Sequence, residues 1–223
     1  TIFFKKGSNL YNLDLARKLS NKLDHIYLVE GYMDVVGLSK NGIENVVANL
    51  GTSLTDKQIL TLNQFFEDII ICFDGDESGY KAALRAAENS IKELQPEKQI
   101  SFLFLPDGED PDSFAKQKSA KELKAYLEEN SKDFIQFKAS LLMNEANNDP
   151  IKKAGLIKEV INSIALIPDM IIRSVYTKEA SNLLEIEEQT LINELNNPTA
   201  RIDFIQFWRE EMERQKDILT TKY

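Results

Sequence analysis

The chain of 223 residues is long enough to bury a hydrophobic core in one large domain or two smaller ones. It contains no apolar stretch of about 20 residues, the length of a membrane-spanning helix, and no charged-then-apolar N-terminal signal. We therefore expect a cytoplasmic protein without a membrane partner. The formal net charge of −9 is opposite in sign to the basic surface of most nucleic-acid-binding proteins, so we expect this chain to grip a nucleic-acid strand poorly by itself.

Short apolar runs predict four buried strands, separated by segments with helical periodicity. The strands are expected over 26–29, 45–48, 68–73 and 99–105. The helices around them are expected over 14–23, 32–39, 55–66, 79–94 and 111–116. Strands that alternate with helices predict an α/β fold with a parallel sheet and right-handed crossovers.

The character of the sequence changes from residue 119 onward. Helical periodicity continues, strand-like runs disappear and glycine nearly vanishes. We expect an all-helical second part, in which Leu156, Val160, Ile164 and Ile167 form a buried stripe. Its helices are expected over 120–130, 132–147, 150–166, 169–184, 186–196 and 199–220.

Acidic side chains follow three of the predicted strands, at or soon after the point where each strand ends. These residues are Glu30, Asp74, Asp76, Asp110 and Asp112. The carboxyl ends of parallel strands share one edge of a sheet, and ligands bind outside that edge. We therefore expect the acids of all three loops to converge on one site.

Clustered carboxylates raise each other's pKa unless a cation neutralises them. Oxygen ligands suit Mg²⁺ or Mn²⁺, and no Cys or His lies in these clusters, so we expect two or more such ions and no zinc. Asp34, one turn beyond Glu30, is a weaker candidate than Glu30 and would act on the metal from behind the direct ligands or through a metal-bound water. The simpler alternative is that the loops are solvated and that acids such as Asp110, just before Pro111, serve as turn residues and helix caps.

Two other segments are candidates for binding phosphate. Gly51, Thr52 and Ser53 follow the second strand, where backbone N–H groups and hydroxyls at a helix start can hold a phosphate. The alternative is a plain Ser or Thr cap for the next helix. Lys5 and Lys6 are candidates for contacts with nucleotide phosphates, with a merely solvated position as the alternative.

Several of these segments resemble the TOPRIM domain, in the version found in bacterial DNA primases. The matching segments are Lys6-Gly7 with Leu10-Tyr11, Glu30-Gly31-Tyr32-Met33-Asp34, Val47-Ala48-Asn49-Leu50-Gly51-Thr52-Ser53, Asp74-Gly75-Asp76, Gly79-x-x-Ala82-Ala83, and Phe104-Leu105-Pro106-Asp107-Gly108-Glu109-Asp110-Pro111-Asp112. They lie in roughly the first half of the chain. The chain departs from the family at Glu77, where many members carry Arg.

The resemblance implies a Rossmann-like parallel sheet and a specific reaction. That reaction is the synthesis of RNA primers on single-stranded DNA from ribonucleoside triphosphates, by metal-dependent nucleotidyl transfer. Glu30, Asp74 and Asp76 take the central, catalytic positions, and Asp34, Asp110 and Asp112 are the surrounding metal ligands. The resemblance also implies a replicative helicase as a partner, bound through a domain that would follow this chain, and a basic lobe and a zinc domain that would precede it.

The expected organisation has three parts. They are a remnant of a preceding basic subdomain with a lead-in helix (1–24), a TOPRIM catalytic domain (25–118) and a helical bundle subdomain (119–223). Because the chain opens on Thr1 and not on methionine, we expect an excised fragment.

Two alternative functions remain open from the residues. A metal-dependent nuclease would use the same acids, because TOPRIM carboxylates also serve hydrolysis. A non-catalytic module for assembling replication proteins would leave the acids idle and bind a partner through its helical part. A topoisomerase is disfavoured, because nothing marks Tyr32 or Tyr80 as a nucleophile.

Overall fold

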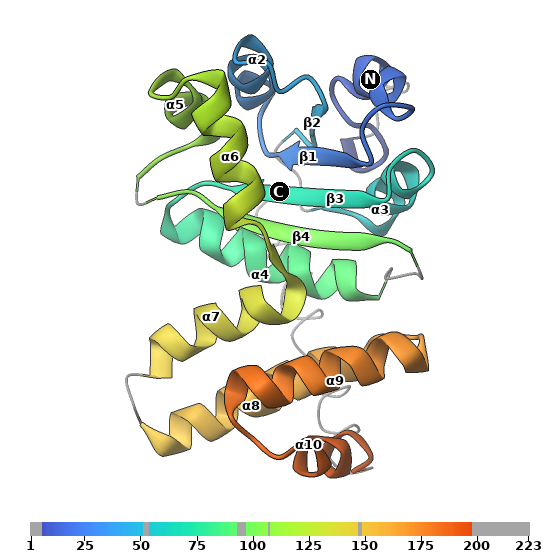
Figure 1. The fold of residues 1–223 in the computed structure, drawn as a ribbon, viewed down its shortest axis with the longest axis vertical. Helices are drawn as coiled ribbons and strands as arrows, with labels where there is room; N and C mark the ends of the chain where they lie inside the picture. Colours follow the sequence, from blue (N-terminus) through green and yellow to red (C-terminus); the bar gives the residue numbers. More distant parts are fainter. Residues whose placement is uncertain (1–5, 51–53, 93–96, 107, 147–148, 198–223) are drawn as a thin grey trace, which may run out of the picture.

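The computed structural model describes residues 6–50, 54–92, 97–106, 108–146 and 149–197, and its fold is drawn in Figure 1. Within these ranges one sheet is formed by β1 (His25–Val29), β2 (Val46–Ala48), β3 (Asp68–Phe73), β4 (Gln99–Phe104) and β5 (Lys132–Asp133). The helical elements are η1 (Lys6–Ser8), α1 (Leu13–Ala16), η2 (Arg17–Leu19), α2 (Tyr32–Lys40), α3 (Asp56–Asn63), α4 (Glu77–Ile91), α5 (Pro111–Lys116), α6 (Ala120–Asn130), α7 (Phe134–Ala146), α8 (Pro150–Ala165), α9 (Met170–Leu184) and α10 (Glu188–Leu195).

The sheet has the strand order β2-β1-β3-β4-β5, with the first four strands parallel and β5 antiparallel to β4. Tyr27 of β1 pairs with Val46 on one side and with Ile70 on the other. The predicted α/β fold with a parallel sheet is thus confirmed. Because β1, β3 and β4 run the same way, their carboxyl ends lie at one edge of the sheet.

Both faces of the sheet are buried, which explains its continuous apolar strands. Ile26 and Leu28 belong to the hydrophobic cluster on one face, and Tyr27 and Val29 belong to the cluster on the other, because successive strand residues point to opposite faces. The first cluster includes residues of α3, α4 and α7 to α10; the second includes residues of α2, α5 and α6. Figure 1 shows α2 and α5 above the sheet and α4 and α7 below it.

The helices from α7 to α10 join the sheet through aromatic side chains. The Phe137 ring stacks on the Phe102 ring, with centroids 4.8 Å apart, and lies 6.2 Å from the Phe104 ring. Val160 of α8 belongs to the same buried cluster as Ile26 of β1. The hydrophobic core therefore runs without a break from the sheet into the helical part, and a domain boundary at residue 119 stays a prediction.

One predicted helix begins later than expected. The helix predicted over 132–147 begins at Phe134, because Lys132–Asp133 pairs with β4 and forms β5. The Asp133 carboxylate then accepts hydrogen bonds from the backbone N–H groups of Ile135 (2.7 Å) and Gln136 (3.0 Å), which caps the start of α7. The expectation that strands end before residue 119 was therefore wrong by one short edge strand.

The helix predicted over 14–23 is also different, because it divides into α1 and η2. The backbone N–H of Ser20 bonds to the carbonyl of Arg17, a spacing that tightens the last turn. Several predicted features lie outside the described residues, namely Lys5, Gly51, Thr52, Ser53 and the helix over 199–220. Among the helices that the structure describes, none has the length and apolar character needed to cross a membrane.

Candidate active site

The acidic loops lie together at the carboxyl edge of the sheet. Glu30 directly follows β1, Asp74 directly follows β3, and Asp110 ends the loop after β4. Asp76 lies at the start of α4. The loops are close enough for their charges to interact, because acids from all three act on the ionisation of Asp74. The structure thus brings together the carboxylates that the strand pattern places at this edge.

A glycine fixes the distance between the second and third loops. The N–H of Gly75 donates to the carbonyl of Glu109 (2.8 Å), and the N–H of Gly108 donates back to the carbonyl of Gly75 (2.9 Å). A Cβ atom on Gly75 would overlap the carbonyl oxygen of Pro106. This role of Gly75 was not predicted from the sequence, where the glycine between two acids, Asp74 and Asp76, is the signal for it.

Glu30 and Asp74 have raised pKa values, and every cause of these shifts acts in the raising direction. Burial raises the pKa of the Asp74 carboxyl to about 6, and repulsion from Glu30 adds to the shift. Burial also raises the pKa of the Glu30 carboxyl, with repulsion from Asp34 as the second cause. Among the described residues, no hydrogen-bond donor or cation offsets these shifts. A bound divalent cation would offset them, because it neutralises the charges that repel one another.

Asp34 is held by backbone donors. Its carboxylate accepts hydrogen bonds from the N–H of Gly31 (2.9 Å) and from the backbone N–H of Asp112. Burial still raises the pKa of Asp34, and repulsion from Asp110 adds to it. Nearby, a Cβ atom on Gly37 would overlap Asp112, so the glycine permits the close packing of α2 on α5. Asp34 therefore ties α2 to α5, and any ion would share its oxygens with these donors.

Asp76 and Asp110 act as helix caps. Asp76 Oδ1 accepts a hydrogen bond from the N–H of Gly79 (2.7 Å) at the start of α4. Asp110 Oδ1 accepts one from the N–H of Ser113 (2.7 Å) at the start of α5. The capping alternative is thus confirmed for both residues. It does not oppose a ligand role, because each of these bonds uses one of two carboxylate oxygens.

Asp112 has a charged partner of its own. Its Oδ2 atom pairs with Lys116 Nζ at 2.5 Å, one turn along α5. This hydrogen bond raises the pKa of the Lys116 ammonium group. In the part of the chain that the structure describes, no three acidic, His or Cys side chains form a ready-made metal cluster. The six predicted acids are therefore neighbours at one edge, with Glu30 and Asp74 the least compensated.

Comparison with known proteins finds similarity to DNA primases. Residues 24–104 match the model of the Toprim domain, and residues 135–189 match that of the DnaB-helicase binding domain of primase. A DNA primase of Pseudomonas aeruginosa is 42% identical over 155 residues, which are 70% of this chain and 23% of that protein. The crystal structure of a DNA primase domain from Pseudomonas aeruginosa matches with a TM-score of 0.78 and 35% identity, over 88% of this chain and 62% of that one. The chain thus contains a match to the Toprim domain, and over most of its length it is similar to bacterial DNA primases.

A second solved relative is the DnaG primase catalytic domain bound to ssDNA. It matches with a TM-score of 0.76 and 33% identity, over 85% of this chain and 60% of that one. The chain spans only part of the length of its curated relatives, 23% of the Pseudomonas aeruginosa primase and 32% of a Staphylococcus aureus primase. The Toprim match ends with β4, and the helicase-binding match begins inside α7.

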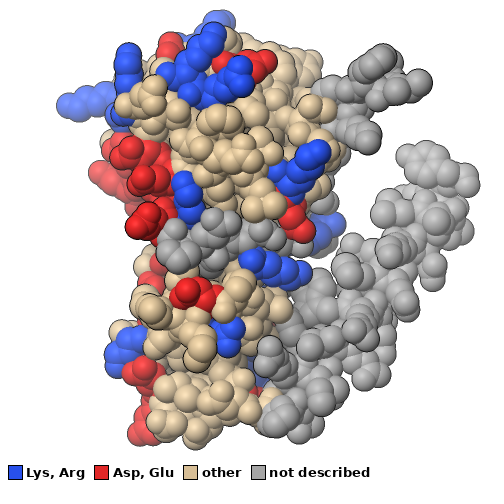
Figure 2. Space-filling view, turned by 90° about the vertical axis from the view of Figure 1, so that its right-hand side faces the viewer, with Lys and Arg blue, Asp and Glu red and all other residues tan. Residues whose placement is uncertain are grey.

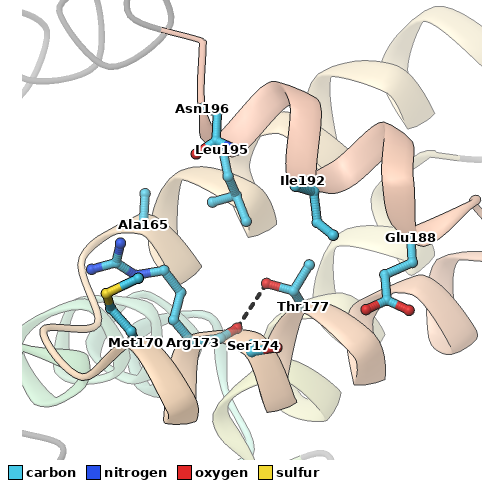
Figure 3. A pocket seen from close by; sticks show the side chains of 9 residues that line it. All are labelled: Ala165, Met170, Arg173, Ser174, Thr177, Glu188, Ile192, Leu195 and Asn196. Atoms are coloured by element: carbon cyan, nitrogen blue, oxygen red, sulfur yellow. Dashed lines mark hydrogen bonds between the residues drawn. The ribbon is translucent and has the colours of Figure 1, made fainter.

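A cavity of about 240 Å³ lies between α8, α9 and α10 (Figure 3). It is lined by Ala165, Met170, Arg173, Ser174, Thr177, Glu188, Ile192, Leu195 and Asn196. The Arg173 guanidinium donates to the carbonyl of Ile167, the Thr177 hydroxyl donates to the carbonyl of Arg173 (2.7 Å), and Glu188 pairs with Lys178 (2.9 Å). Because these polar groups are bonded within the helical part, the acidic edge of the sheet is the better candidate for chemistry.

Proposed function

We propose that this chain carries the catalytic core of an enzyme that synthesises short RNA primers on single-stranded DNA. The reaction would be a metal-dependent nucleotidyl transfer from ribonucleoside triphosphates to the growing RNA primer. One observation carries the proposal: Glu30 and Asp74 lie together at the carboxyl edge of a parallel sheet, and the pKa of each is raised. The similarity to catalytic domains of DNA primases supports the choice of reaction.

The carboxylates of this edge fit two or more Mg²⁺ or Mn²⁺ ions. All the candidate ligands are carboxylate oxygens, and their mutual repulsion favours a bound cation. Glu30, Asp74 and Asp76 would bind directly, and the other three acids would take the surrounding positions. When bound, the ions would neutralise charge on the triphosphate and on the leaving pyrophosphate, and would activate the primer 3′-hydroxyl.

The protein's own contribution is to hold the carboxylates in position and to control their protons. The bonds between Gly75, Gly108 and Glu109 keep the loops after β3 and β4 together. Asp34 keeps α2 against α5. With a pKa of about 6, Asp74 retains a proton in a small fraction of molecules at neutral pH, and this proton must leave before an ion binds.

We extend the proposal to partners of the helical part. The match of residues 135–189 to a helicase-binding domain supports contact between α7–α10 and a replicative helicase. Single-stranded DNA is the expected template, and the solved relative that is bound to ssDNA supports this partner. The helicase contact predicted through a domain that would follow this chain stays a separate prediction.

The first experiment tests the metal site and the reaction together. The protein is incubated with Mn²⁺, labelled ribonucleotides and unlabelled single-stranded DNA, and Mn²⁺ binding is measured separately by calorimetry. We expect short labelled RNA from the unchanged chain, and loss of both the RNA and most Mn²⁺ affinity in Asp74→Asn. Asp169→Asn is the control, because it makes the same chemical change at Asp169, which caps α9 in the helical part and does not belong to the acidic edge.

A parallel reaction with labelled DNA separates the alternatives. Shortened DNA without new RNA would favour the nuclease. Intact DNA without any new RNA would favour a non-catalytic module, provided that the unchanged chain and Asp74→Asn bind Mn²⁺ with equal affinity. This result would contradict the proposal.

A further inference from the structure

Two tyrosine rings are exposed beside the acidic edge. Tyr32 is the first residue of α2, two positions after Glu30, and 57% of it is exposed to solvent. Tyr11 is 42% exposed, and its ring lies against that of Tyr32 with centroids 6.3 Å apart and planes at 65°. Large aromatic residues with this exposure beside a polar site leave ring surface open for a ligand.

The main chain fixes Tyr11 at this edge of the sheet. The N–H of Tyr11 donates to the carbonyl of Ala48 (2.8 Å), and the N–H of Ala48 donates back to the carbonyl of Tyr11 (3.2 Å). Ala48 is the last residue of β2, so this bridge places Tyr11 at the carboxyl end of the strands. The Asn12 side chain reinforces the bridge by donating to the carbonyl of Val46 (2.9 Å).

The surface around the two rings is apolar and open. Val36, one turn after Tyr32 on α2, and the neighbouring Met33 are both exposed. A cavity of about 450 Å³ lies next to the rings, lined by residues 8–15 and including Tyr11. The rings therefore lie between a hollow with both polar and apolar lining and the carboxylates of the acidic edge.

We infer that Tyr11 and Tyr32 form a stacking platform for a nucleobase whose phosphates are held at the acidic edge. This inference rests on the proposed function and adds a base-binding surface to it. The net charge of −9 makes attraction by the whole chain a poor source of affinity for a polyanion, whereas stacking on a ring needs no net positive charge. Stacking of a base on an aromatic ring corresponds to about five- to 150-fold in affinity and tolerates every base.

The base could belong to a nucleic-acid strand or to the incoming ribonucleotide, and two binding experiments distinguish these sources. The first compares a short oligothymidylate with an abasic strand of the same length. The second compares adenosine triphosphate with ribose triphosphate that lacks the base, both with Mn²⁺. We expect the unchanged protein to prefer the base-containing probe by about five-fold or more in at least one experiment. The experiment that shows this preference identifies the source of the base.

The variants test whether the rings cause that preference. Tyr32→Leu and Tyr11→Leu keep an apolar side chain but remove the ring, so the preference for bases should fall to about one. Tyr32→Phe and Tyr11→Phe keep the ring and should retain the preference for bases. If the hydroxyl groups were responsible instead, these two variants would lose it. Phe65→Leu is the matched control, because Phe65 is an exposed aromatic residue between α3 and the start of β3, at the other edge of the sheet.

Two outcomes would overturn the inference. One is equal or undetectable binding of base-containing and base-free probes by the unchanged protein. The other is an undiminished base preference in both leucine variants. Mn²⁺ affinity measured without nucleotide tests the proposed function separately. We expect Asp74→Asn to lose this affinity and the two leucine variants to keep it, so the metal site and the stacking platform can fail independently.

Discussion

At the scale of single residues, Asp74 determines how the site responds to pH. Its pKa of about 6 lies above the ordinary value of 3.8, so the folded protein binds this proton more tightly than the unfolded chain does. Deprotonation above pH 6 therefore destabilises the folded state, and this cost disappears as the pH falls from 6 towards 3.8. A bound cation reverses the effect, because it stabilises the charged form.

Asp74→Asn should therefore stabilise the protein when metal ions are removed. We expect a gain in the free energy of unfolding of about 1 kcal/mol near pH 8, a value reduced for the partial exposure of the side chain. The gain should shrink as the pH falls below about 6. Urea unfolding in the presence of a chelator, at several pH values, measures it. Added Mn²⁺ should stabilise the unchanged protein and not the variant, and a gain that is the same at every pH would refute the raised pKa.

At the scale of elements, the site depends on how closely the loops after β3 and β4 approach. The N–H of Gly75 donates to the carbonyl of Glu109, the N–H of Gly108 donates to the carbonyl of Gly75, and the position of Gly75 leaves no room for a side chain. The spacing between the acids after β3 and those after β4 is therefore set by backbone contacts.

Gly75→Ala should push the two loops apart. We expect a loss of about 1–3 kcal/mol in the free energy of unfolding, because the new Cβ meets the Pro106 carbonyl. Mn²⁺ affinity should fall as well, as measured by calorimetry. Gly155→Ala is the control: Gly155 lies in α8 with open space around it, so alanine there should stabilise the protein by about 0.5–1 kcal/mol. Equal effects of both substitutions would contradict the argument.

The elements that the sequence predicts well are those whose pattern is local. The strand over 68–73 is a continuous apolar run, and the helix over 120–130 starts at the cap Ser119; both have the expected bounds. Strand β5 has no such pattern, because Lys132 and Asp133 are polar and become a strand only by pairing with β4. Its existence depends on tertiary contacts that periodicity does not report.

The candidate site also combines features that follow from local sequence with features that depend on tertiary contacts. The positions of Glu30 and Asp74 at the edge follow from strand ends that the sequence marks. The backbone bond from Asp112 to Asp34, and the exposed pair formed by Tyr11 with Tyr32, join segments far apart in the chain. Such contacts depend on how α2 packs against α5 and on how the N-terminal segment meets β2, so they could not be predicted from one sequence.

At the scale of the whole molecule, one core and an uneven charge distribution stand out. The cluster that contains Ile26 of β1 also contains Leu184 of α9 and Leu191 of α10. Figure 2 shows Lys and Arg side chains gathered at the end of the molecule that carries the sheet, with a group of Asp and Glu side chains lower on the same face. A protein with a net charge of −9 thus still presents a local basic surface, where contact with phosphates should weaken as salt rises.

The continuous core predicts that the sheet and the helical part unfold together. Phe137→Ala removes a buried ring that stacks on Phe102, so we expect a loss of about 3–5 kcal/mol in the free energy of unfolding. Hydrogen exchange should show the same loss for the amides of β3 and of α9. Phe65→Ala, at an exposed ring, should cost much less. A loss confined to α9 would instead support two independent domains divided near residue 119.

The two outermost strands also limit how this molecule meets others. β2 has three residues, the last of which is already paired with Tyr11, and β5 has two. Short, partly covered edge strands offer few free backbone groups to a strand from another chain. These edges therefore disfavour the edge-to-edge pairing of strands from different molecules. We expect a protein partner to recognise this molecule through its side chains and helices.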